Sequence, residues 1–578
     1  MIAFIVLLPF LVALLVVSLL KNGKLIAYVS IAASLIGLAM LPFVSLGSYS
    51  INWFNVGGAE ISLMSSISEI NILLLILVLG LAPFIYTYSL GYFKEKSSLK
   101  RYYVEMLAFT LAMAMFAISG NFITFFVAWE FLSVISYLLI GFWYTKGSAS
   151  EAARKVITIV FIGDIALIVS IALFWNAYNT FTFSNIISAT GKGAEPIVAT
   201  ILLIIAILTK SAQFPFHEWL PDAMEGPVPV SAYLHSATMV KAGVFAAVIL
   251  FPIFLHTKTL WYFVVIGLLT AILAVTNAMR EKHVKRILAY STVEELALML
   301  SAIGVGAIGA ALYFFFAQAF YKSLLFFSSG VMIDANESEN IEKIYGLKKN
   351  RFVYISTLFG VLALAGFIPF DGFFANIGIG SSFANNLAAY AIISLISIGT
   401  SFFIFRWLFV TSKDTKNRNV NIVYLSEPKS MIVPMLFLAA IVILASAVFF
   451  YFAYFGYMLT LSIEESIIET ALVVVGFLFG YLVYSKQKIK ARLGIIEKLA
   501  YNSIFINLFY YVFARFVYLI GEGVNIFDLY LNDLFDWFGH LINRLGDLAR
   551  GIVNGDVSFY ALIVIIGMIL TWILVVFA

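Results

Sequence analysis

The sequence predicts an all-α polytopic membrane protein with about 16 transmembrane helices. Composition is the first reason: of 578 residues, 63% are hydrophobic and 11% are charged. A soluble domain is roughly 45–50% apolar, with about a quarter of its residues charged. The second reason is a series of apolar runs, each with roughly the 20 residues that a spanning helix needs. The third is that basic residues gather in alternate connections between these runs.

Apolar runs of spanning length follow one another along most of the chain. We place the transmembrane helices at 2–20, 25–46, 69–90, 103–119, 121–143, 156–177, 198–216, 228–255, 260–279, 287–305, 308–333, 352–375, 386–410, 432–456, 466–485 and 558–578. The first run lacks a basic leader and a small-residue cleavage site. We therefore expect it to remain as a spanning helix and not to be removed as a signal peptide.

Lysine and arginine occupy one set of connections. With the first connection taken as cytoplasmic, the inside set is Lys21, Lys24, Lys94, Lys96, Lys100, Arg101, Lys146, Arg154, Lys155, Arg280, Lys282, Lys285, Arg286, Lys343, Lys348, Lys349, Arg351, Lys413, Lys416 and Arg418. The opposite connections contribute Lys192 and Lys258. Because cytoplasmic connections are enriched in Lys and Arg, we expect a multi-pass protein of the cell membrane with both termini outside.

Residues 486–555 differ from the apolar runs. Charged side chains recur there among aromatic and aliphatic ones, among them Asp528, Asp533, Asp536, Arg544, Asp547 and Arg550. This mixture is too polar to span and predicts an amphipathic helix along the membrane surface. A continuous helix of this kind would be roughly 100 Å long, and we expect it to bend at Gly521 and Gly523; two short interfacial helices are the alternative. The run at 558–578 then anchors the end of the chain.

Two counts exclude whole classes of function. Cysteine is absent, which excludes a disulfide framework, a thiolate cluster ligand and a catalytic thiol. The chain also has no nucleotide-binding loop and no recognisable haem or metal site, so we expect no cofactor in it. The net charge of +4 is small and spread over the connections, so we do not expect a nucleic acid as partner.

Two spanning runs are interrupted by proline in a similar way. The segment "TKSAQFPFHEW" contains Pro215 and is followed by His217, and "LAGFIPFDGFF" contains Pro369 and is followed by Asp371. Proline removes a backbone donor and frees a carbonyl one turn earlier. Inside a bilayer such groups persist only when they are buried in protein or line a wet cavity. Paired interruptions predict internal repeats with sites near the midplane; two incidental kinks are the alternative.

Ionisable residues fall in the middle of several runs. They are Glu130, Asp164, Lys210, His235, Lys241, Glu294, Glu295 and Lys322. Each central ion costs roughly 2.5–3.5 kcal/mol to insert, so the row would cost more than the roughly 5–15 kcal/mol that stabilises a typical fold. These groups must therefore be paired, hydrated or partly neutralised. We expect Glu130 to pair with Lys210, and each group to be either part of an ion path or a structural ion pair.

Two adjacent pairs constrain this interpretation. Glu294 and Glu295 point about 100° apart on a helix, so both cannot face one channel. Lys285 and Arg286 lie at the end of a predicted helix, so we expect them at the membrane interface.

Four segments carry a family resemblance. The stretches "WEFLSVISYLLIGFWY", "TKSAQFPFHEWLPDAMEGPVPVSAYLHSATMVKAGVF", "KRILAYST" and "AFYKSLLFFSSG" resemble the antiporter-like subunits of respiratory complex I. The same family includes the large subunits of Mrp-type cation/proton antiporters and their equivalents in membrane-bound hydrogenases. The resemblance covers roughly residues 65–410, and the amphipathic stretch with its final helix is similar to subunit L, whose lateral helix straps neighbouring subunits together.

The resemblance implies a domain organisation around two inverted five-helix repeats, each with a broken helix. It divides the chain into N-terminal helices (1–100), a first repeat (101–256), a second repeat (257–411), additional helices (412–485), a lateral helix on the cytoplasmic side (486–555) and a terminal anchor (556–578).

The resemblance also implies the function of an ion-translocating subunit, for protons or sodium ions, in a redox-driven respiratory complex. On it, the ion path contains Glu130, Asp164, Lys210, His235 and Lys322, and the Glu130–Lys210 pair opens and closes with proton movement. From the residues themselves we add Lys241, Glu294 and Asp371 to the predicted path. The implied partners are antiporter-like and small helical membrane subunits, and a peripheral redox module. Any iron–sulfur or other redox centre is expected on those partners.

The chain departs from the family pattern at two positions. Asn376 stands where most relatives have a titrating lysine or glutamate, and Gln318 stands in place of a histidine. A structural strapping subunit with a disabled channel is therefore one alternative. An Mrp-type antiporter subunit and a stand-alone secondary transporter are two others. The ion, the redox partner and the direction of coupling stay open at this point.

Overall fold

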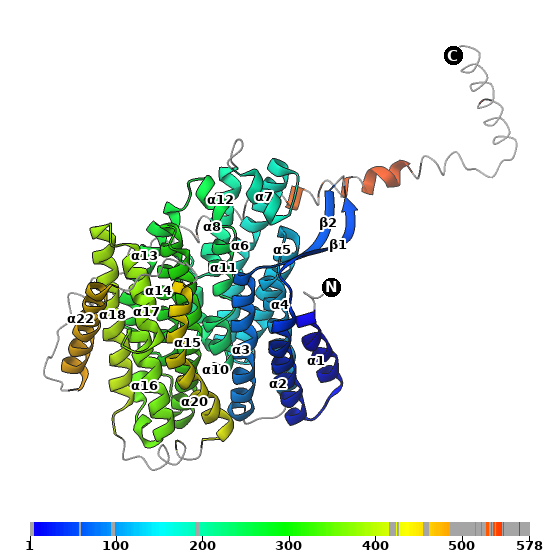
Figure 1. Ribbon diagram of the computed structural model, residues 1–578. Coiled ribbons are helices and arrows are strands. Elements are labelled where there is room, and N and C mark those ends of the chain that lie inside the picture. Colours follow the sequence, from blue (N-terminus) through cyan, green and yellow to red (C-terminus); the bar gives the residue numbers. More distant parts are fainter. Residues whose placement is uncertain are drawn as a thin grey trace. The chain divides into compact units, whose positions relative to one another are not determined.

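The computed structural model describes residues 5–56, 59–93, 99–190, 196–414, 424, 427–454 and 462–485, with scattered residues between 515 and 566. The chain divides into two compact units, Met1–Arg492 and Leu493–Ala578. The first unit is a bundle of helices with one small sheet (Figure 1). Among the described residues, 11 helices are long and apolar enough to cross a membrane, and three shorter apolar helices accompany them.

The helices of the first unit follow the predicted runs. They are α1 (Leu8–Leu19), α2 (Gly23–Met40), α3 (Glu69–Tyr92), α4 (Leu99–Ala117), α5 (Phe122–Ile140), α6 (Gly147–Tyr178), α7 (Phe183–Ala189), α8 (Ile197–Lys210), α9 (Trp219–Asp222), α10 (Val228–Ser236), α11 (Lys241–Ile249), α12 (Phe251–His256), α13 (Trp261–Ala278), α14 (Val284–Gly304), α15 (Ile308–Asn336), α16 (Arg351–Ala365), α17 (Asp371–Ser382), α18 (Leu387–Thr411), α20 (Lys429–Leu444), α21 (Ser446–Tyr454) and α22 (Ile463–Gly480). Each run predicted up to residue 485 overlaps at least one of them.

The all-α expectation is wrong for residues 47–67. Strands β1 (Gly47–Val56) and β2 (Ala59–Ile67) form an antiparallel hairpin. Tyr49, Ile51 and Trp53 recur with the period of two that is typical of a strand. The hairpin docks on the connection between α4 and α5, where the Asn121 side chain donates to the Ser62 carbonyl at 2.7 Å.

Both predicted helix breaks are present. α8 ends at Lys210 and α9 begins at Trp219, with Pro215 between them; α16 ends at Ala365 and α17 begins at Asp371, with Pro369 between them. At the first break, side chains satisfy the freed carbonyls: the Trp219 indole donates to Thr209, and the Gln213 amide donates to Ser211. The breaks are therefore built into the protein interior, as backbone at membrane depth requires.

A third interruption was not predicted. We expected one helix over 228–255, whereas α10 ends at Ser236 and α11 begins at Lys241. Hydroxyls explain the difference, because the Thr238 side chain donates to the Tyr233 carbonyl at 2.7 Å. Serine and threonine offer the backbone such local alternatives to helix hydrogen bonds.

The most deeply buried part of the bundle is its centre. The spans Val228–Ile249, Val284–Gly304 and Ile308–Asn336 are 89–94% buried, against 56% or less for the other spans described. They contain α10 and α11, α14, and α15, and α10 and α14 both pack against α15. Figure 1 shows these elements in the middle of the bundle. Ionisable residues on them are therefore surrounded by protein and not by lipid.

The second unit, Leu493–Ala578, holds most of the predicted lateral helix. Its described residues between 515 and 547 are helical, including Asp528, Asp533 and Arg544. The rest of 486–555 lies outside the described residues. So does the predicted terminal span at 558–578, apart from Ile566, which is helical.

Candidate functional site

A buried ion pair lies at the first helix break. The Lys210 ammonium is 3.8 Å from Oδ1 of Asp164, on α6. It also donates to the Ser133 hydroxyl at 2.5 Å and to the Trp129 carbonyl at 3.3 Å, and it lies 4.5 Å from the centroid of the Trp129 ring. A Cβ at Gly163 would meet the Thr209 Cβ at 2.7 Å. The glycine thus allows the close approach of α6 to α8 that brings Asp164 beside Lys210.

Glu130 was the predicted partner of Lys210, and the structure places it differently. Asp164 makes the ion pair, and it also accepts hydrogen bonds from the Trp129 indole at 2.7 Å and from Ser133 at 3.1 Å. Glu130 is half-buried, and its Oε1 has no hydrogen-bond partner among the described residues. It lies near enough to interact electrostatically with both Lys210 and Asp164. Lys210 therefore forms an ion pair with one carboxylate and interacts electrostatically with a second.

The centre of the row lies where α10 and α11 meet α15. The Lys241 ammonium donates to the Phe315 carbonyl and lies 4.6 Å from the centroid of its ring. His235 is fully buried, and neither ring nitrogen has a hydrogen-bond partner in the described part of the chain. The Ser236 and Ser323 hydroxyls meet at 2.7 Å. Polar contacts thus link both α10 and α11 to α15.

A second buried ion pair joins α14 and α15. The Lys322 ammonium is 2.9 Å from Oε2 of Glu295 and also donates to the Ser291 hydroxyl. The Glu295 carboxylate accepts further hydrogen bonds from Gln318 and Tyr321, each at 2.9 Å. Gln318, which stands in place of the family's histidine, therefore donates a hydrogen bond to this carboxylate.

The predicted ion path includes Glu294 and leaves out Glu295. The two carboxylates do diverge, as predicted from the helix geometry. Glu295 faces Lys322, whereas Glu294 accepts a hydrogen bond from the Thr400 hydroxyl of α18 at 2.9 Å. Helical spacing could show that only one faces the lysine; which one depends on how α14 is rotated against α15.

Asp371 begins α17, immediately after the second break. It is fully buried; its Oδ1 accepts a hydrogen bond from the Gly372 backbone at 2.9 Å, and its Oδ2 has no partner among the described residues. A carboxylate in the first turn of a helix is favoured by the helix dipole. Five residues on, the Asn376 amide donates to Oε1 of Glu469 on α22 at 3.0 Å.

Charged groups continue from the first break toward the connections rich in lysine and arginine. Nε2 of the buried His217 lies 3.2 Å from Oε1 of Glu218, and the Tyr290 hydroxyl donates to Glu218 at 3.4 Å. Beyond them, the Asp222 carboxylate pairs with Lys155 at 2.5 Å and Arg286 at 3.6 Å.

Lys285, which we expected at the membrane interface, is buried within the protein at the start of α14. Its ammonium is 3.3 Å from Oε1 of Glu339, in the connection after α15, and donates to the carbonyls of Met224 and Gly226. Arg286, its neighbour, is partly exposed. The hydrogen bond from His283 at 2.9 Å, together with the charge of Lys285, lowers the pKa of Glu339 to about 2.

Buried polar atoms without a protein partner follow the same row. Among the described residues they include atoms of Glu130, Gln213, His217, His235, Glu294, Gln318 and Asp371. Buried polar groups are almost always hydrogen-bonded to protein or to water, and inside a bilayer an unsatisfied group costs several kcal/mol. The row is therefore suited to hydration along its length.

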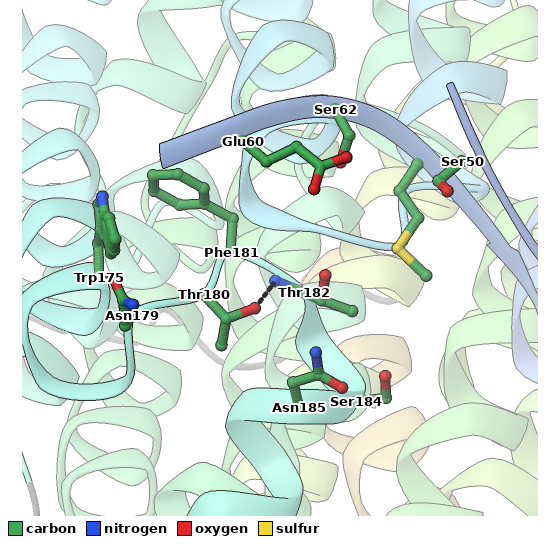
Figure 2. Close-up of a pocket in the computed structure, with 11 residues that line it drawn as sticks. Ser50, Glu60, Ser62, Trp175, Asn179, Thr180, Phe181, Thr182, Ser184 and Asn185 are labelled. Carbon is green, nitrogen blue, oxygen red and sulfur yellow. Dashed lines mark hydrogen bonds between the residues drawn. The ribbon is translucent and has the colours of Figure 1, made fainter. Parts of the chain in front are cut away.

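The described residues contain no group of three or more His, Cys, Asp or Glu placed to hold a metal ion. A separate hollow of about 560 Å³ lies between β2 and the connection from α6 to α7. Figure 2 shows Glu60 and Ser62 facing Thr180 and Asn185 across it. The predicted ion-path residues do not line it.

Comparison with known families decides what this arrangement belongs to. A family model described as "NADH:quinone oxidoreductase/Mrp antiporter, TM" matches residues 119–405, and one described as "NADH-Ubiquinone oxidoreductase (complex I), chain 5 N-terminus" matches residues 53–103. The chain belongs to the NADH:quinone oxidoreductase/Mrp antiporter family. Every predicted ion-path residue, from Glu130 to Asp371, falls within the larger match. Glu469 lies outside it.

Individual relatives agree with this assignment. The chain is 29% identical to NADH-quinone oxidoreductase subunit L of Buchnera aphidicola, over 96% of this chain and 95% of that one. It is 35% identical to the chloroplastic NAD(P)H-quinone oxidoreductase subunit 5 of Anthoceros angustus, over 64% of this chain and 53% of that one. The chain thus spans nearly all of the first relative and about half the length of the second.

Two solved structures share the fold. One is the Mrp complex from Dietzia sp. DQ12-45-1b, with a TM-score of 0.70 and 22% identity over 99% of this chain and 63% of that chain. The other is the membrane-bound sulfane sulfur reductase, an archaeal respiratory membrane complex, with a TM-score of 0.68 and 20% identity over 83% of this chain and 99% of that chain.

Proposed function

We propose that this chain is a cation-translocating subunit of a redox-driven respiratory membrane complex, and that protons or sodium ions move along its row of buried ionisable residues. The observation that carries the proposal is the pair of buried lysine–carboxylate contacts, Lys210–Asp164 and Lys322–Glu295, on either side of the polar junction at Lys241. Intramembrane ionisable residues that face the bundle interior mark ion paths. The family assignment supports the same function.

The first pair supplies the switch. If a proton neutralises Asp164, the buried Lys210 ammonium loses its partner, and an unpaired buried charge is strongly unfavourable. The free carboxylate of Glu130 then becomes the better partner. Movement of Lys210 from Asp164 to Glu130 changes the charge presented to His235 and Lys241, and this change in charge favours cation movement toward Lys322.

The proposed entry lies on the side of the basic connections, through His217 and Glu218 beside the break at Pro215. The proposed exit lies beyond Lys322, near Asp371 and the break at Pro369. We take the basic side as cytoplasmic, which places both termini outside and the lateral helix at 486–555 on the cytoplasmic side.

The two breaks also support the proposed repeats at 101–256 and 257–411. Each segment ends with a broken helix and one further span, α8–α9 followed by α10–α11 in the first and α16–α17 followed by α18 in the second. α8 enters its break from the side opposite the basic connections, and α16 enters from the basic side. The two broken helices thus run in opposite directions, as inverted repeats require.

Partner subunits must supply the driving free energy, because moving one charge against 100 mV costs about 2.3 kcal/mol. Relatives named as subunits of quinone oxidoreductases suggest neighbouring antiporter-like and small helical subunits, and a peripheral module with iron–sulfur or other redox centres.

Ion translocation by the assembled complex tests the proposal. In proteoliposomes, Lys210→Ala is expected to abolish cation movement while the complex still assembles, and Lys258→Ala, an exposed lysine in an outer connection, is the matched control. Translocation by Lys210→Ala equal to that of Lys258→Ala would remove the central lysine from the path and contradict the proposal.

A further inference from the structure

The carboxylate of Glu469 lies beside Asn376, the amide that stands where most relatives have a titrating side chain. Glu469 is 8% exposed, and its Oε1 accepts the hydrogen bond from the Asn376 amide at 3.0 Å. It belongs to α22, outside the segment that matches the family model. A titratable group is therefore present at this position in space, although it comes from a different helix.

The second break is shaped around this contact. Gly366 ends α16 with φ of 79°. A Cβ added there would lie 2.5 Å from the Asn376 amide nitrogen and 3.5 Å from Oε1 of Glu469. A side chain at 366 would thus displace the amide that holds the carboxylate. The Asn376–Glu469 contact is therefore built into the buried interior of the second break.

A polar face on α18 links Glu469 to the rest of the row. Thr400 donates to Glu294 at 2.9 Å, and Ser401 donates to the Val473 carbonyl of α22 at 2.8 Å. Ser397, also buried, is three residues before Thr400, so the hydroxyls lie on one face of the helix. Val473 is one turn beyond Glu469. Hydroxyl groups therefore extend from Glu294 to the helix that carries Glu469.

Glu469 also adjoins a small hollow. The hollow is lined by Asn376, Tyr390, Ser394, Glu465 and Glu469, among others, and has a volume of about 10 Å³. A space of about this size holds one water. α22 begins at Ile463, after the connection opposite the basic side, so Glu469 is two turns from that end, and Glu465 is one turn nearer to it.

We propose that Glu469 is the outer proton-exchange group of this chain and takes the role that Asn376 cannot fill. The inference rests on the proposed function. A proton leaves the Glu294 carboxyl through the hydroxyls of α18 and binds the Glu469 carboxylate, which becomes neutral. The Glu469 carboxyl then releases that proton to water in the hollow beside Glu465 and regains its negative charge.

The direct test is Glu469→Gln in the full assembled complex. Glutamine keeps the size and an oxygen that can accept the Asn376 hydrogen bond, so the fold is retained while titration is lost. Proton translocation is expected to fall roughly 100-fold, the lower end of what a positioned acid–base group contributes. Glu464→Gln, on an exposed residue in the first turn of α22, is the matched control, and equal rates in the two variants would overturn the inference.

A second variant separates titration from structure. Adding Asn376→Glu to Glu469→Gln returns a carboxyl group to the same site from α17, and we expect it to restore translocation. Failure of this rescue in an assembled complex would also overturn the inference. In infrared difference spectra, the loss of a carboxyl band in Glu469→Gln, but not in Glu464→Gln, is the expected signature, and an unchanged band would count against it.

Failure of this inference differs from failure of the proposed function. If Lys210→Ala and Lys322→Ala abolish translocation while Glu469→Gln does not, the path exists but ends elsewhere. If the two lysine variants translocate normally, the proposed function itself fails.

Discussion

The two buried lysine–carboxylate pairs differ in how firmly they are held. At the first break, the Lys210 ammonium stands 3.8 Å from Asp164, and Glu130 is near with an unbonded oxygen. Between α14 and α15, the Lys322 ammonium lies only 2.9 Å from Glu295. Both carboxylates accept two further hydrogen bonds, so the pairs differ in the distance between their charged atoms. The comparison teaches that the first pair is the more loosely held, so the Lys210 ammonium can leave its partner more readily than the Lys322 ammonium can.

The largest expected effect is on stability, at the second pair. Lys322→Ala leaves Glu295 buried without its countercharge, and loss of one partner of a buried pair costs about 3–5 kcal/mol. Chemical unfolding of the purified complex should show this loss. Asp164→Asn should cost less, about 1–3 kcal/mol, because Glu130 remains for Lys210. An equal or greater loss in Asp164→Asn would break the comparison.

The next effect is on transport, at the first pair. Glu130→Gln should slow cation translocation at least about tenfold with no change in assembly, because the second partner of Lys210 is lost while the Asp164 contact stays. The rate in proteoliposomes measures this, and Glu151→Gln, an exposed glutamate on α6, is the control. Normal transport by Glu130→Gln would show that Lys210 needs only one partner.

A smaller effect concerns pH, outside the membrane. Because the pKa of Glu339 is lowered to about 2, its contribution to stability is complete above its unfolded pKa of about 4.3 and is lost as the pH falls toward 2. Glu339→Gln should therefore be less stable than the parent at pH 7 by about 0.5–1 kcal/mol, since the partly exposed carboxylate is screened. The difference should shrink between about pH 4.3 and pH 2. A difference that grows on acidification would contradict the contact with His283 and Lys285.

The smallest effect is expected at the exposed pair of Lys282 and Glu342, whose charged atoms lie 3.1 Å apart. Lys282→Ala should change stability by about 0–0.5 kcal/mol and leave transport unchanged, because exposed ion pairs contribute little. A transport defect in Lys282→Ala would mean that losing any charged side chain slows transport, whether or not the residue belongs to the buried row.

Much of this molecule could be predicted from its sequence, because the strongest signals are local. Apolar length predicted the spans up to residue 485, and proline predicted the breaks at Pro215 and Pro369. A lysine or glutamate within such a run predicted burial inside the protein. The hairpin at 47–67 was missed because its alternating pattern is short and lies between two strong helical runs.

The partners of the buried charges could not be predicted, because they depend on how helices pack. Asp164 rather than Glu130 meets Lys210 because Gly163 lets α6 approach α8. Glu295 rather than Glu294 meets Lys322 because of the rotation of α14. Glu469 stands more than 90 residues after Asn376 in the chain, and only the packing of α17 against α22 brings them together.

A double-mutant cycle on Asp164 and Glu130 tests the exchange of partners by Lys210 most directly. Cation translocation per turnover is measured in proteoliposomes for Asp164→Asn, Glu130→Gln and the double variant. If both carboxylates serve one switch, each single variant loses translocation and the double variant is no worse than the worse single one. Losses that multiply, or a single variant with normal translocation, would contradict the account.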